Sequence, residues 1–466
     1  MIGEVISEVI GAVISAVSDQ HISMPELSDD TCKGGREPWG WTVERSYEIP
    51  YPELGSVLGE QEIGVLTRLV TSGENLSGGR CREEFERCFR EYLDVPYALS
   101  VTSGTVALEI AIRLLDLNEG DEVIATPQTY KASVQPLLNY PVKVRFCDVE
   151  PNTLNIDPGH FESLITSRTK AVILVHYGGL PCDMDAIMAI ARRHGITVIE
   201  DCAHALGAEY RGRKPGALAD IGCFSFHSSK NITTLGEGGM ITLFDPALAE
   251  RADRIRSNDA DAVYRAQART IGNTTSAHPW MLHPGTAFTH DCSTIRYGGT
   301  NATLAEPNAA VGTVQLAKLD RLVRRRAEIA AAYTDVLKQH PGVRMHEGPD
   351  PVRHAHHLYT FFADPADGIL RDRLVSRLDA LGVQMQLRYF PMHLLAEWRA
   401  RGHTAGECPV AERLWFEQQV NLPCHPAMTD RQVGQVVSRL DTVLGQEARD
   451  QPIASVTTPT AEGWNR

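Results

Sequence analysis

Between residues 97 and 227, short apolar runs alternate with segments of helical periodicity. The apolar runs are YALSV (97–101), EVIAT (122–126), KVRFCDV (143–149), AVILV (171–175), TVIED (197–201) and CFSFH (223–227). Helical spacing of apolar residues covers 82–93, a helix is expected to begin near Thr105, and a helix-like run extends from Ala132 to Leu138. Nearly continuous apolar strands between helices are typical of a parallel sheet covered on both faces, so the pattern predicts an α/β fold.

The rest of the chain divides into further parts that differ in composition and in the periodicity of their apolar residues. A long helix is predicted from Ala305 to His340, and residues 258–295, rich in Thr, Asn, His, Gly and Pro, form a long insertion. We predict an N-terminal extension over 1–45, partly helical or irregular, a large domain over 46–315, a smaller C-terminal α+β domain over 316–445, and a flexible tail over 446–466.

Composition excludes several classes of protein. The formal net charge of −14 argues against a nucleic-acid-binding surface, which is normally basic. The 10 cysteines include no CxxC spacing, so we expect neither a disulfide framework nor a zinc site. The His354, His356 and His357 tract lacks a cysteine or carboxylate at ligand spacing, and we predict no metal site.

The first eighteen residues are unusually apolar, but they do not predict a membrane segment. No Lys or Arg precedes Lys33, and Glu4 and Glu8 interrupt the run, which is unlike a secretory signal. The run is also too short to span a bilayer. We expect it to pack on the body of the protein or on a second subunit, and we expect a cytoplasmic protein without a membrane partner.

Several polar residues follow the predicted strands, where open α/β sheets bind their ligands. Taken singly, Ser103–Thr105 reads as a capped helix start, Asp201 as a strand-end carboxylate, Lys230 as a surface lysine and residues 236–239 as a tight turn. Together they supply what a pyridoxal-phosphate enzyme needs: a lysine, a carboxylate for the ring nitrogen, a phosphate cradle and a stacking ring.

The motifs that contain these residues resemble one family. They are YALSVTSGTVALEIAI, ATPQTYKAS, VHYGGLPCDMDAI, VIEDCAHALGAEY, FSFHSSKNITTLGEGGMI, GTNATLAEPNAAVGTVQL and LRYFPMH. They are similar to those of the DegT/DnrJ/EryC1/StrS aminotransferases, and the similarity runs from about Tyr51 to Leu444. The resemblance implies a fold-type-I pyridoxal-phosphate (PLP) transferase, with a mainly parallel seven-stranded sheet in a large PLP-binding domain and a smaller C-terminal domain.

The resemblance also implies catalytic and ring-binding roles. Lys230 would be the Schiff-base lysine and the acid/base that moves the proton. Asp201 would pair with the pyridinium nitrogen and keep it protonated. His204 matches the Gln or His that lies near the phenolic oxygen of the cofactor.

The remaining cofactor contacts follow in the same way. Tyr130 falls where the family has an aromatic residue stacked on the ring, and Gly104, Thr105 and Ser225 would hold the phosphate. Asn301 matches an asparagine that reaches this phosphate from the neighbouring subunit. The resemblance therefore implies a homodimer with shared sites, with the cofactor alternating between PLP and pyridoxamine phosphate (PMP).

The implied reaction moves an amino group from glutamate or glutamine to the ketone of a keto-sugar, free or nucleotide-linked, or of a keto-cyclitol. Two departures bear on the substrate: Thr303 stands where the family often has Arg, and the loop between Arg256 and Gly299 is long. The Gly-x-Asn form at residues 299–301, with the long loop before it, resembles the branch that makes aminocyclitols and aminohydroxybenzoate in secondary metabolism, including antibiotic biosynthesis.

Two alternatives stay open. A PLP-dependent dehydratase or other non-transaminating deoxysugar or cyclitol enzyme belongs to the same family, although the known dehydratase variant has His in place of the lysine. A cofactor-free regulatory relative is the other alternative, and the intact set of cofactor residues speaks against it.

Overall fold

The computed structural model describes residues 47–258, 298–348, 351–367 and 369–447. The predictions for the extension over 1–45, for most of the 258–295 loop and for the tail over 446–466 lie outside these residues. No helix within the described ranges is both long enough and apolar enough to cross a membrane. The predicted domain division stays a prediction, and its boundary at 315 and 316 lies within one long helix.

The centre of the fold is a seven-stranded sheet of order β1-β8-β7-β5-β4-β2-β3. Its strands are β1 (Tyr97–Val101), β2 (Glu122–Ala125), β3 (Lys143–Phe146), β4 (Thr169–Val175), β5 (Thr197–Asp201), β7 (Ile221–Ser225) and β8 (Gly239–Leu243). Only β8 is antiparallel to its neighbours, β1 and β7. The prediction of a mainly parallel seven-stranded sheet is confirmed, although β8 was not among the predicted strands.

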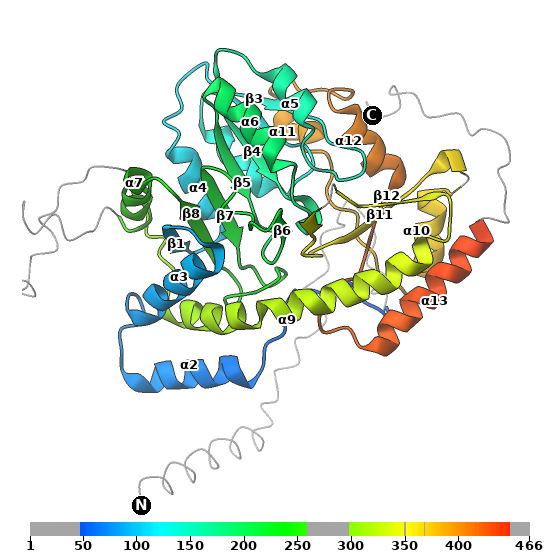
Figure 1. Cartoon of the computed structure of the whole chain (residues 1–466), viewed down its shortest axis with the longest axis horizontal. Helices are drawn as coiled ribbons and strands as arrows, with labels where there is room; N and C mark the ends of the chain where they lie inside the picture. The colour runs from blue at the N-terminus through cyan, green and yellow to red at the C-terminus, as the bar shows by residue number, and fades with distance from the viewer. Residues whose placement is uncertain (1–46, 259–297, 349–350, 368, 448–466) are drawn as a thin grey trace, which may run out of the picture. The chain divides into compact units, whose positions relative to one another are not determined.

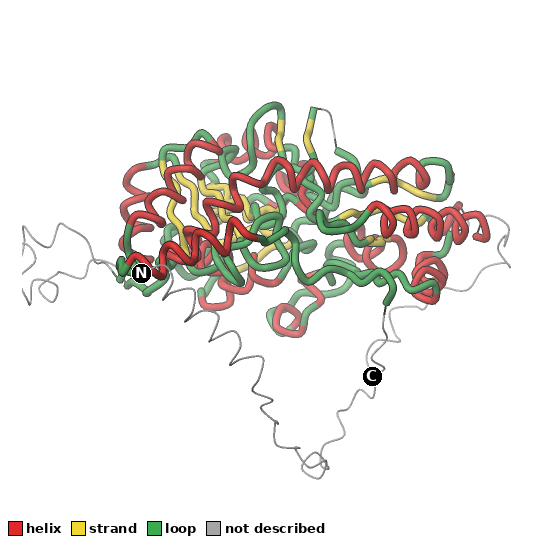
Figure 2. The backbone as a smooth tube through the Cα atoms, turned by 90° about the horizontal axis from the view of Figure 1, so that it is seen from below, coloured by secondary structure: helices red, strands yellow, loops and turns green. Residues whose placement is uncertain are grey.

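Helices cover both faces of this sheet, which explains the continuous apolar strands (Figures 1 and 2). In β4, Ala171 and Ile173 join the core under α4 (Gly104–Arg113) and α7 (Pro246–Arg256), and Val172 and Leu174 join the core under α5 (Pro158–Leu164) and α6 (Met184–His194). Side chains of alternate strand residues point to opposite faces, so a sheet buried on both sides requires apolar residues at every position.

A smaller α+β lobe follows in sequence. Its antiparallel sheet has the order β12-β11-β9, from β9 (Val343–Met345), β11 (Tyr359–Ala363) and β12 (Gln419–Leu422). Its helices include α10 (Arg371–Ala380) and α13 (Asp430–Glu447). The short helices α11 (Ala396–Arg399) and α12 (Pro409–Arg413) pack instead in the core of the central sheet, through Trp398 and Ala411. Strand β10 (Val352–Arg353) pairs with β6 (Glu209–Tyr210) of the large lobe.

The long helix α9 (Glu306–Leu337) joins the two lobes (Figure 1). Its first half, with Ala309 and Leu319, packs in one core with Phe85 and Phe89 of α3 (Arg80–Leu93). Its second half, with Tyr333, packs in the core of the small lobe. Because one continuous helix contributes side chains to both cores, it connects the two lobes firmly.

A buried arginine on α9 connects this helix to the loop that contains Lys230. Arg326 is 1% exposed and donates hydrogen bonds to the carbonyl oxygens of Gly55, His356 and Cys424. The N–H of Gly55 donates to the carbonyl of Ser228 at 2.8 Å. The segment before α2 (Glu60–Ser72) therefore lies directly against the backbone of residues 228–230.

We predict that Gly55→Ala disturbs this loop. A Cβ atom at position 55 would lie closer than 3.0 Å to the carbonyl oxygens of Ser229 and Lys230, and backbone oxygens cannot yield as a side chain can. We expect a loss of about 1–3 kcal/mol in the free energy of unfolding, measured by urea titration. Gly59→Ala is the control, because nothing lies within 4 Å of a Cβ there. Equal destabilisation by both substitutions would contradict the prediction.

Candidate functional site

A cavity of about 650 Å³ lies at the carboxyl ends of the central strands. Its lining includes Thr105 after β1, Tyr130 after β2, Asp201 at the end of β5 and Ser225 at the end of β7. Residues 386–389 of the small lobe close the other side. The position beyond the carboxyl ends is the one expected for a ligand site in an α/β sheet.

Seven of the eight predicted site residues line this cavity: Gly104, Thr105, Tyr130, Asp201, His204, Ser225 and Lys230. Asn301 does not. Asn301 is exposed and forms an isolated β-bridge with Ser257. Two residues further on, Thr303 forms a bridge with Val101 of β1. The roles assigned to all eight residues stay predictions.

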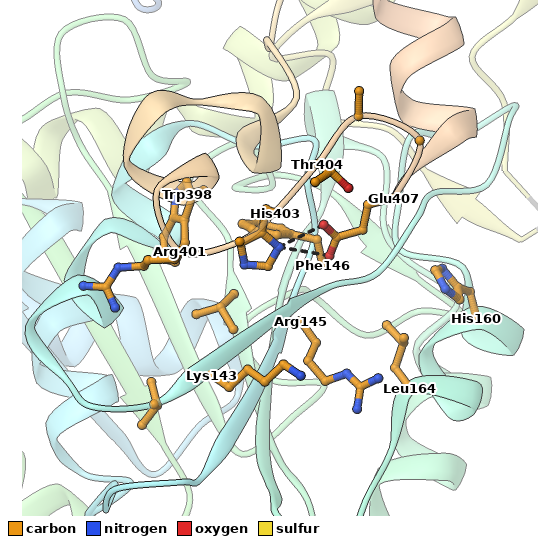
Figure 3. Close-up of a pocket in the computed structure, with 15 residues that line it drawn as sticks. Lys143, Arg145, Phe146, His160, Leu164, Trp398, Arg401, His403, Thr404 and Glu407 are labelled. Carbon is orange, nitrogen blue, oxygen red and sulfur yellow. Dashed lines mark hydrogen bonds and ion pairs between the residues drawn. The ribbon is translucent and has the colours of Figure 1, made fainter. Parts of the chain in front are cut away.

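A second cavity, of about 830 Å³, lies along the edge strand β3 (Figure 3). Lys143 and Arg145 of β3 line one side, and Trp398, Arg401 and the His403–Glu407 pair line the other. None of the predicted site residues lies there. The second cavity is therefore not the candidate active site, although its volume is larger than that of the first.

The start of α4 forms a corner of the first cavity that is suited to an anion. Ser103 caps the helix by accepting a hydrogen bond from the N–H of Val106 at 3.2 Å. The first N–H groups of a helix have no partner within the helix, so those of Gly104 and Thr105 are available to a ligand. A Cβ at position 104 would lie 2.7 Å from the Ser225 Cβ, so a glycine is needed for this close approach.

Asp201 is held rigidly at the end of β5. One carboxylate oxygen accepts a hydrogen bond from Ser133 Oγ at 2.6 Å, and the other accepts one from the N–H of Ala203 at 3.0 Å. The side chain is 5% exposed but lines the cavity. A carboxylate fixed in this way is suited to pair with a cationic ring nitrogen.

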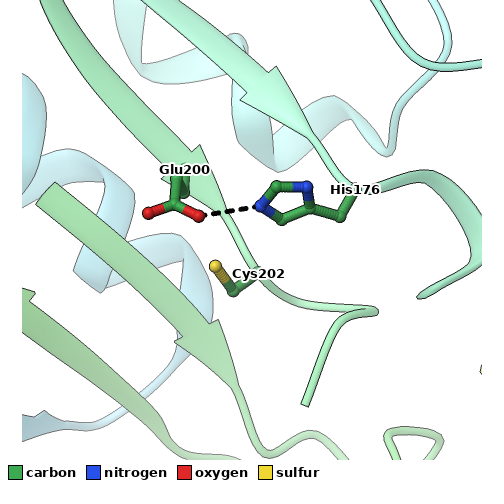
Figure 4. Close-up of side chains that lie close together, drawn as sticks. All are labelled: His176, Glu200 and Cys202. Carbon is green, nitrogen blue, oxygen red and sulfur yellow. Dashed lines mark hydrogen bonds and ion pairs between the residues drawn. The ribbon is translucent and has the colours of Figure 1, made fainter. Parts of the chain in front are cut away.

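The residues on either side of Asp201 anchor the strand. Glu200 is buried and accepts hydrogen bonds from the N–H groups of Gly216, Leu218 and Ala219, and its Oε2 lies 2.9 Å from His176 Nε2 (Figure 4).

Cys202 completes a group of three close ligand-type atoms with His176 and Glu200. Burial raises the pKa of the Cys202 thiol well above its usual value, which keeps it protonated and a poor metal ligand. The other ring nitrogen of His176 accepts a hydrogen bond from the N–H of Cys182. These contacts account for the group as a structural anchor.

His204 lies between two other rings. His357 stacks on it with ring centroids 4.3 Å apart, and the Tyr389 hydroxyl lies 3.2 Å from Nε2. Burial, together with the charges of Lys230 and Arg388, lowers the pKa of His204 well below its usual value, so the ring is neutral. Its Nδ1 is buried without a hydrogen-bond partner among the described residues. His204 lines the cavity, and a buried ring nitrogen without a partner suits a polar ligand atom.

Lys230 carries the amine of the site on a turn after β7. Its N–H donates to the carbonyl of His227 at 2.9 Å. Burial lowers the pKa of Lys230 to about 8, against the attraction of Asp201 and with the help of the Arg388 charge. A lysine with this pKa has a substantial neutral fraction near neutral pH, as a nucleophilic amine requires.

Sequence reasoning did not assign roles to several residues in or behind the cavity. Ser133 lies behind the lining and orients Asp201. Gln386, Arg388 and Tyr389 form the wall contributed by the small lobe. The motif LRYFPMH contains Arg388 and Tyr389 and was the signal for this wall.

The cavity fits PLP. The orphan His204 nitrogen, the free N–H groups of α4, the Asp201 carboxylate and the Lys230 amine match the phenolic oxygen, phosphate, ring nitrogen and aldehyde of that group. Bound there, PLP would supply an electron-accepting ring. Together with the α/β fold, this donor set is that of a fold-type-I PLP-dependent aminotransferase.

Comparison with known proteins agrees. Residues 57–441 match the model of the DegT/DnrJ/EryC1/StrS aminotransferase family. The spore coat polysaccharide biosynthesis protein SpsC of Bacillus subtilis is 33% identical over 87% of this chain and 99% of its own length. The GDP-perosamine synthase of Caulobacter vibrioides is 34% identical over 79% of this chain and 91% of its own.

Solved structures are similar as well. The aminotransferase TlmJ from Streptoalloteichus hindustanus has a TM-score of 0.74 and 30% identity, covering 85% of this chain and 99% of TlmJ. DesV of S. venezuelae has a TM-score of 0.70 and 31% identity, covering 82% and 94%. The chain belongs to the DegT/DnrJ/EryC1/StrS aminotransferase family and is a PLP-dependent aminotransferase.

We predict that the Lys230 amine of the cofactor-free protein titrates near pH 8. Competitive labelling with acetic anhydride, followed by mass spectrometry of the Lys230 peptide, measures this midpoint. Asp201→Asn should lower the midpoint further, because the carboxylate favours the charged amine. A midpoint near the ordinary lysine value of about 10.4, or an upward shift in Asp201→Asn, would contradict the prediction.

Proposed function

We propose that this enzyme transfers an amino group from glutamate or glutamine to the ketone of a keto-sugar, free or nucleotide-linked, or of a keto-cyclitol. The donor amino acid leaves as its 2-oxo acid, and the acceptor C=O becomes CH–NH₂, so no outside oxidant or reductant is needed. The observation that carries the proposal is the Lys230 amine, with its pKa lowered to about 8, in one cavity with Asp201.

In this proposal each side chain of the cavity has one task. Lys230 holds the cofactor through its amine and then moves the proton at the reacting carbon. Asp201, oriented by Ser133, keeps the ring nitrogen protonated. Gly104, Thr105 and Ser225 bind the phosphate, His204 meets the phenolic oxygen, and Tyr130, 52% exposed at the cavity, covers the ring.

The class of acceptor is supported from two sides. Many groups of the cavity are hydroxyl or amide bearing, among them Ser103, Thr129, Ser229 and Gln386, which suits a ketone rich in hydroxyl groups. The GDP-perosamine synthase of C. vibrioides is a 34% identical relative. A role in amino-sugar or secondary-metabolite biosynthesis belongs to the same proposal.

The direct test follows the visible absorbance of the bound cofactor. Glutamate or glutamine should bleach the band, and only the matching class from a panel of keto-sugars, keto-cyclitols and keto acids should restore it. Lys230→Ala should abolish both changes. Lys170→Ala is the control and should retain them, because Lys170 lies at the amino end of β4, where its amine is 3.8 Å from Asp121. Amino transfer by Lys230→Ala, or loss of water from the ketone without gain of nitrogen, would overturn the proposal.

We also propose that the active unit is a homodimer in which Asn301 completes the neighbouring site. Asn301 is exposed and lies outside the cavity of its own chain. The segment around α2 leaves large apolar side chains in solvent, with Ile63 65% and Val70 68% exposed, as expected of a surface that a partner covers.

Shared sites predict complementation between two inactive variants. Lys230→Ala and Asn301→Ala are each expected to be poorly active at limiting cofactor. Unfolded together and refolded as a mixture, half of the dimers combine both chains and regain one intact site, so about a quarter of wild-type activity should return. Activity no greater than the mean of the two variants would contradict the shared site.

A further inference from the structure

The second cavity collects positive charge, although the chain as a whole carries a formal net charge of −14. Its lining includes the cations Lys143, Arg145 and Arg401. The one carboxylate among the described residues of the lining, Glu407, already pairs with His403 at 2.9 Å. A volume of about 830 Å³ is enough for a small molecule, and the roles proposed above leave this cavity unused.

Neighbouring carboxylates balance these cations only in part. Within the part of the chain that the structure describes, no ion pair includes Lys143 or Arg401. Arg145 lies 3.3 Å from Glu122, but the same carboxylate also pairs with Arg168 at 3.1 Å. One carboxylate therefore faces two guanidinium groups, and the cavity keeps a positive field that attracts anions.

The open edge of β3 adds an uncharged hydrogen-bond donor. The N–H groups of Lys143 and Cys147 donate to the carbonyls of Asp121 and Ala125 on the β2 side, each at 2.9 Å. Alternate residues of a strand direct their N–H groups to opposite sides. The N–H of Val144, which lines the cavity, therefore points to the edge at which β3 has no neighbouring strand.

Further donors lie on the other sides of the cavity (Figure 3). His160 Nδ1 accepts the N–H of Asp148 at 2.8 Å, so a neutral ring carries its proton on Nε2. In the loop after α11, the N–H groups of Thr404 and Ala405 and the Thr404 hydroxyl have no hydrogen-bond partner among the described residues. Cations together with free N–H and O–H donors suit a ligand with several anionic oxygens.

The number of cations indicates the kind of anion. A single carboxylate would balance only one of the three, whereas a diphosphate carries several negative charges and enough oxygens for donors on more than one side. We propose that the second cavity binds the diphosphate group of a small metabolite, at a site separate from that of the cofactor. Inorganic pyrophosphate and nucleoside diphosphates share this group. The inference does not depend on the proposed amino transfer.

The test locates binding by protection of Lys143 in the cofactor-loaded enzyme. Pyrophosphate, UDP and GDP are added in turn, and acetylation of the Lys143 amine by acetic anhydride is followed by peptide mass spectrometry. A bound diphosphate should slow this acetylation about 10-fold at saturation. Lys170, at the amino end of β4 and outside the cavity, is the control and should react unchanged. The ligand that protects at the lowest concentration identifies the source of the diphosphate.

Sodium sulfate at equal ionic strength distinguishes binding from screening of the cavity's charges. Protection by sulfate that equals the protection by all three ligands would overturn the inference. The absence of protection by any of the three would overturn it as well.

Removal of single charges provides an independent measurement. Lys143→Gln and Arg401→Gln should each raise the dissociation constant of the protecting ligand about 10-fold, measured by calorimetry. Both should leave the visible absorbance of the bound cofactor unchanged, because neither residue lines the first cavity. Arg193→Gln is the matched control, since it removes a guanidinium 2.6 Å from Glu162, outside the second cavity. Equal affinity in all three variants and the wild type would contradict the site.

Discussion

The convergence of strand ends at one edge of the sheet is the constraint on which the site depends. Four neighbouring strands, β2, β4, β5 and β7, are parallel. β1 runs in the same direction as they do, because β8 lies between β1 and β7 and is antiparallel to both. Residues as distant in sequence as Thr105, Asp201 and Lys230 therefore line one cavity. The small lobe closes that cavity through residues 386–389, and α9 contributes to the cores of both lobes.

Within that frame, burial and the neighbouring charges set the pKa of the Lys230 amine. Burial disfavours the ammonium form more than Asp201 favours it, which leaves an amine with a pKa of about 8. The backbone beneath is fixed by Gly55, itself bonded to the buried Arg326. The stability of the lobe junction and the reactivity of the amine thus depend on the same short segment.

Most of the sheet could be read from the sequence, since strands buried on both faces are continuously apolar. β8 was not predicted, because its sequence, GMITL, begins within the glycine-rich residues 236–239, which were interpreted as a tight turn. The residues next to strand ends, such as Asp201 and Ser225, were found by the same rule. Ser133 and Arg388 were not found. Ser133 bonds Asp201 from a turn after β2, and Arg388 enters the cavity with the small lobe, and no local periodicity encodes either placement. The role proposed for Asn301 would require a second subunit, which no pattern within one chain can locate.

We propose that the amine of Lys230 is the group through which this enzyme holds its cofactor. Borohydride reduction of the cofactor-loaded enzyme fixes the cofactor to the amine that holds it, and peptide mass spectrometry then locates the modified lysine. We expect the added mass on the peptide that contains Lys230, and on no other lysine. Modification of another lysine, or none in a protein that has taken up the cofactor, would contradict this role of Lys230.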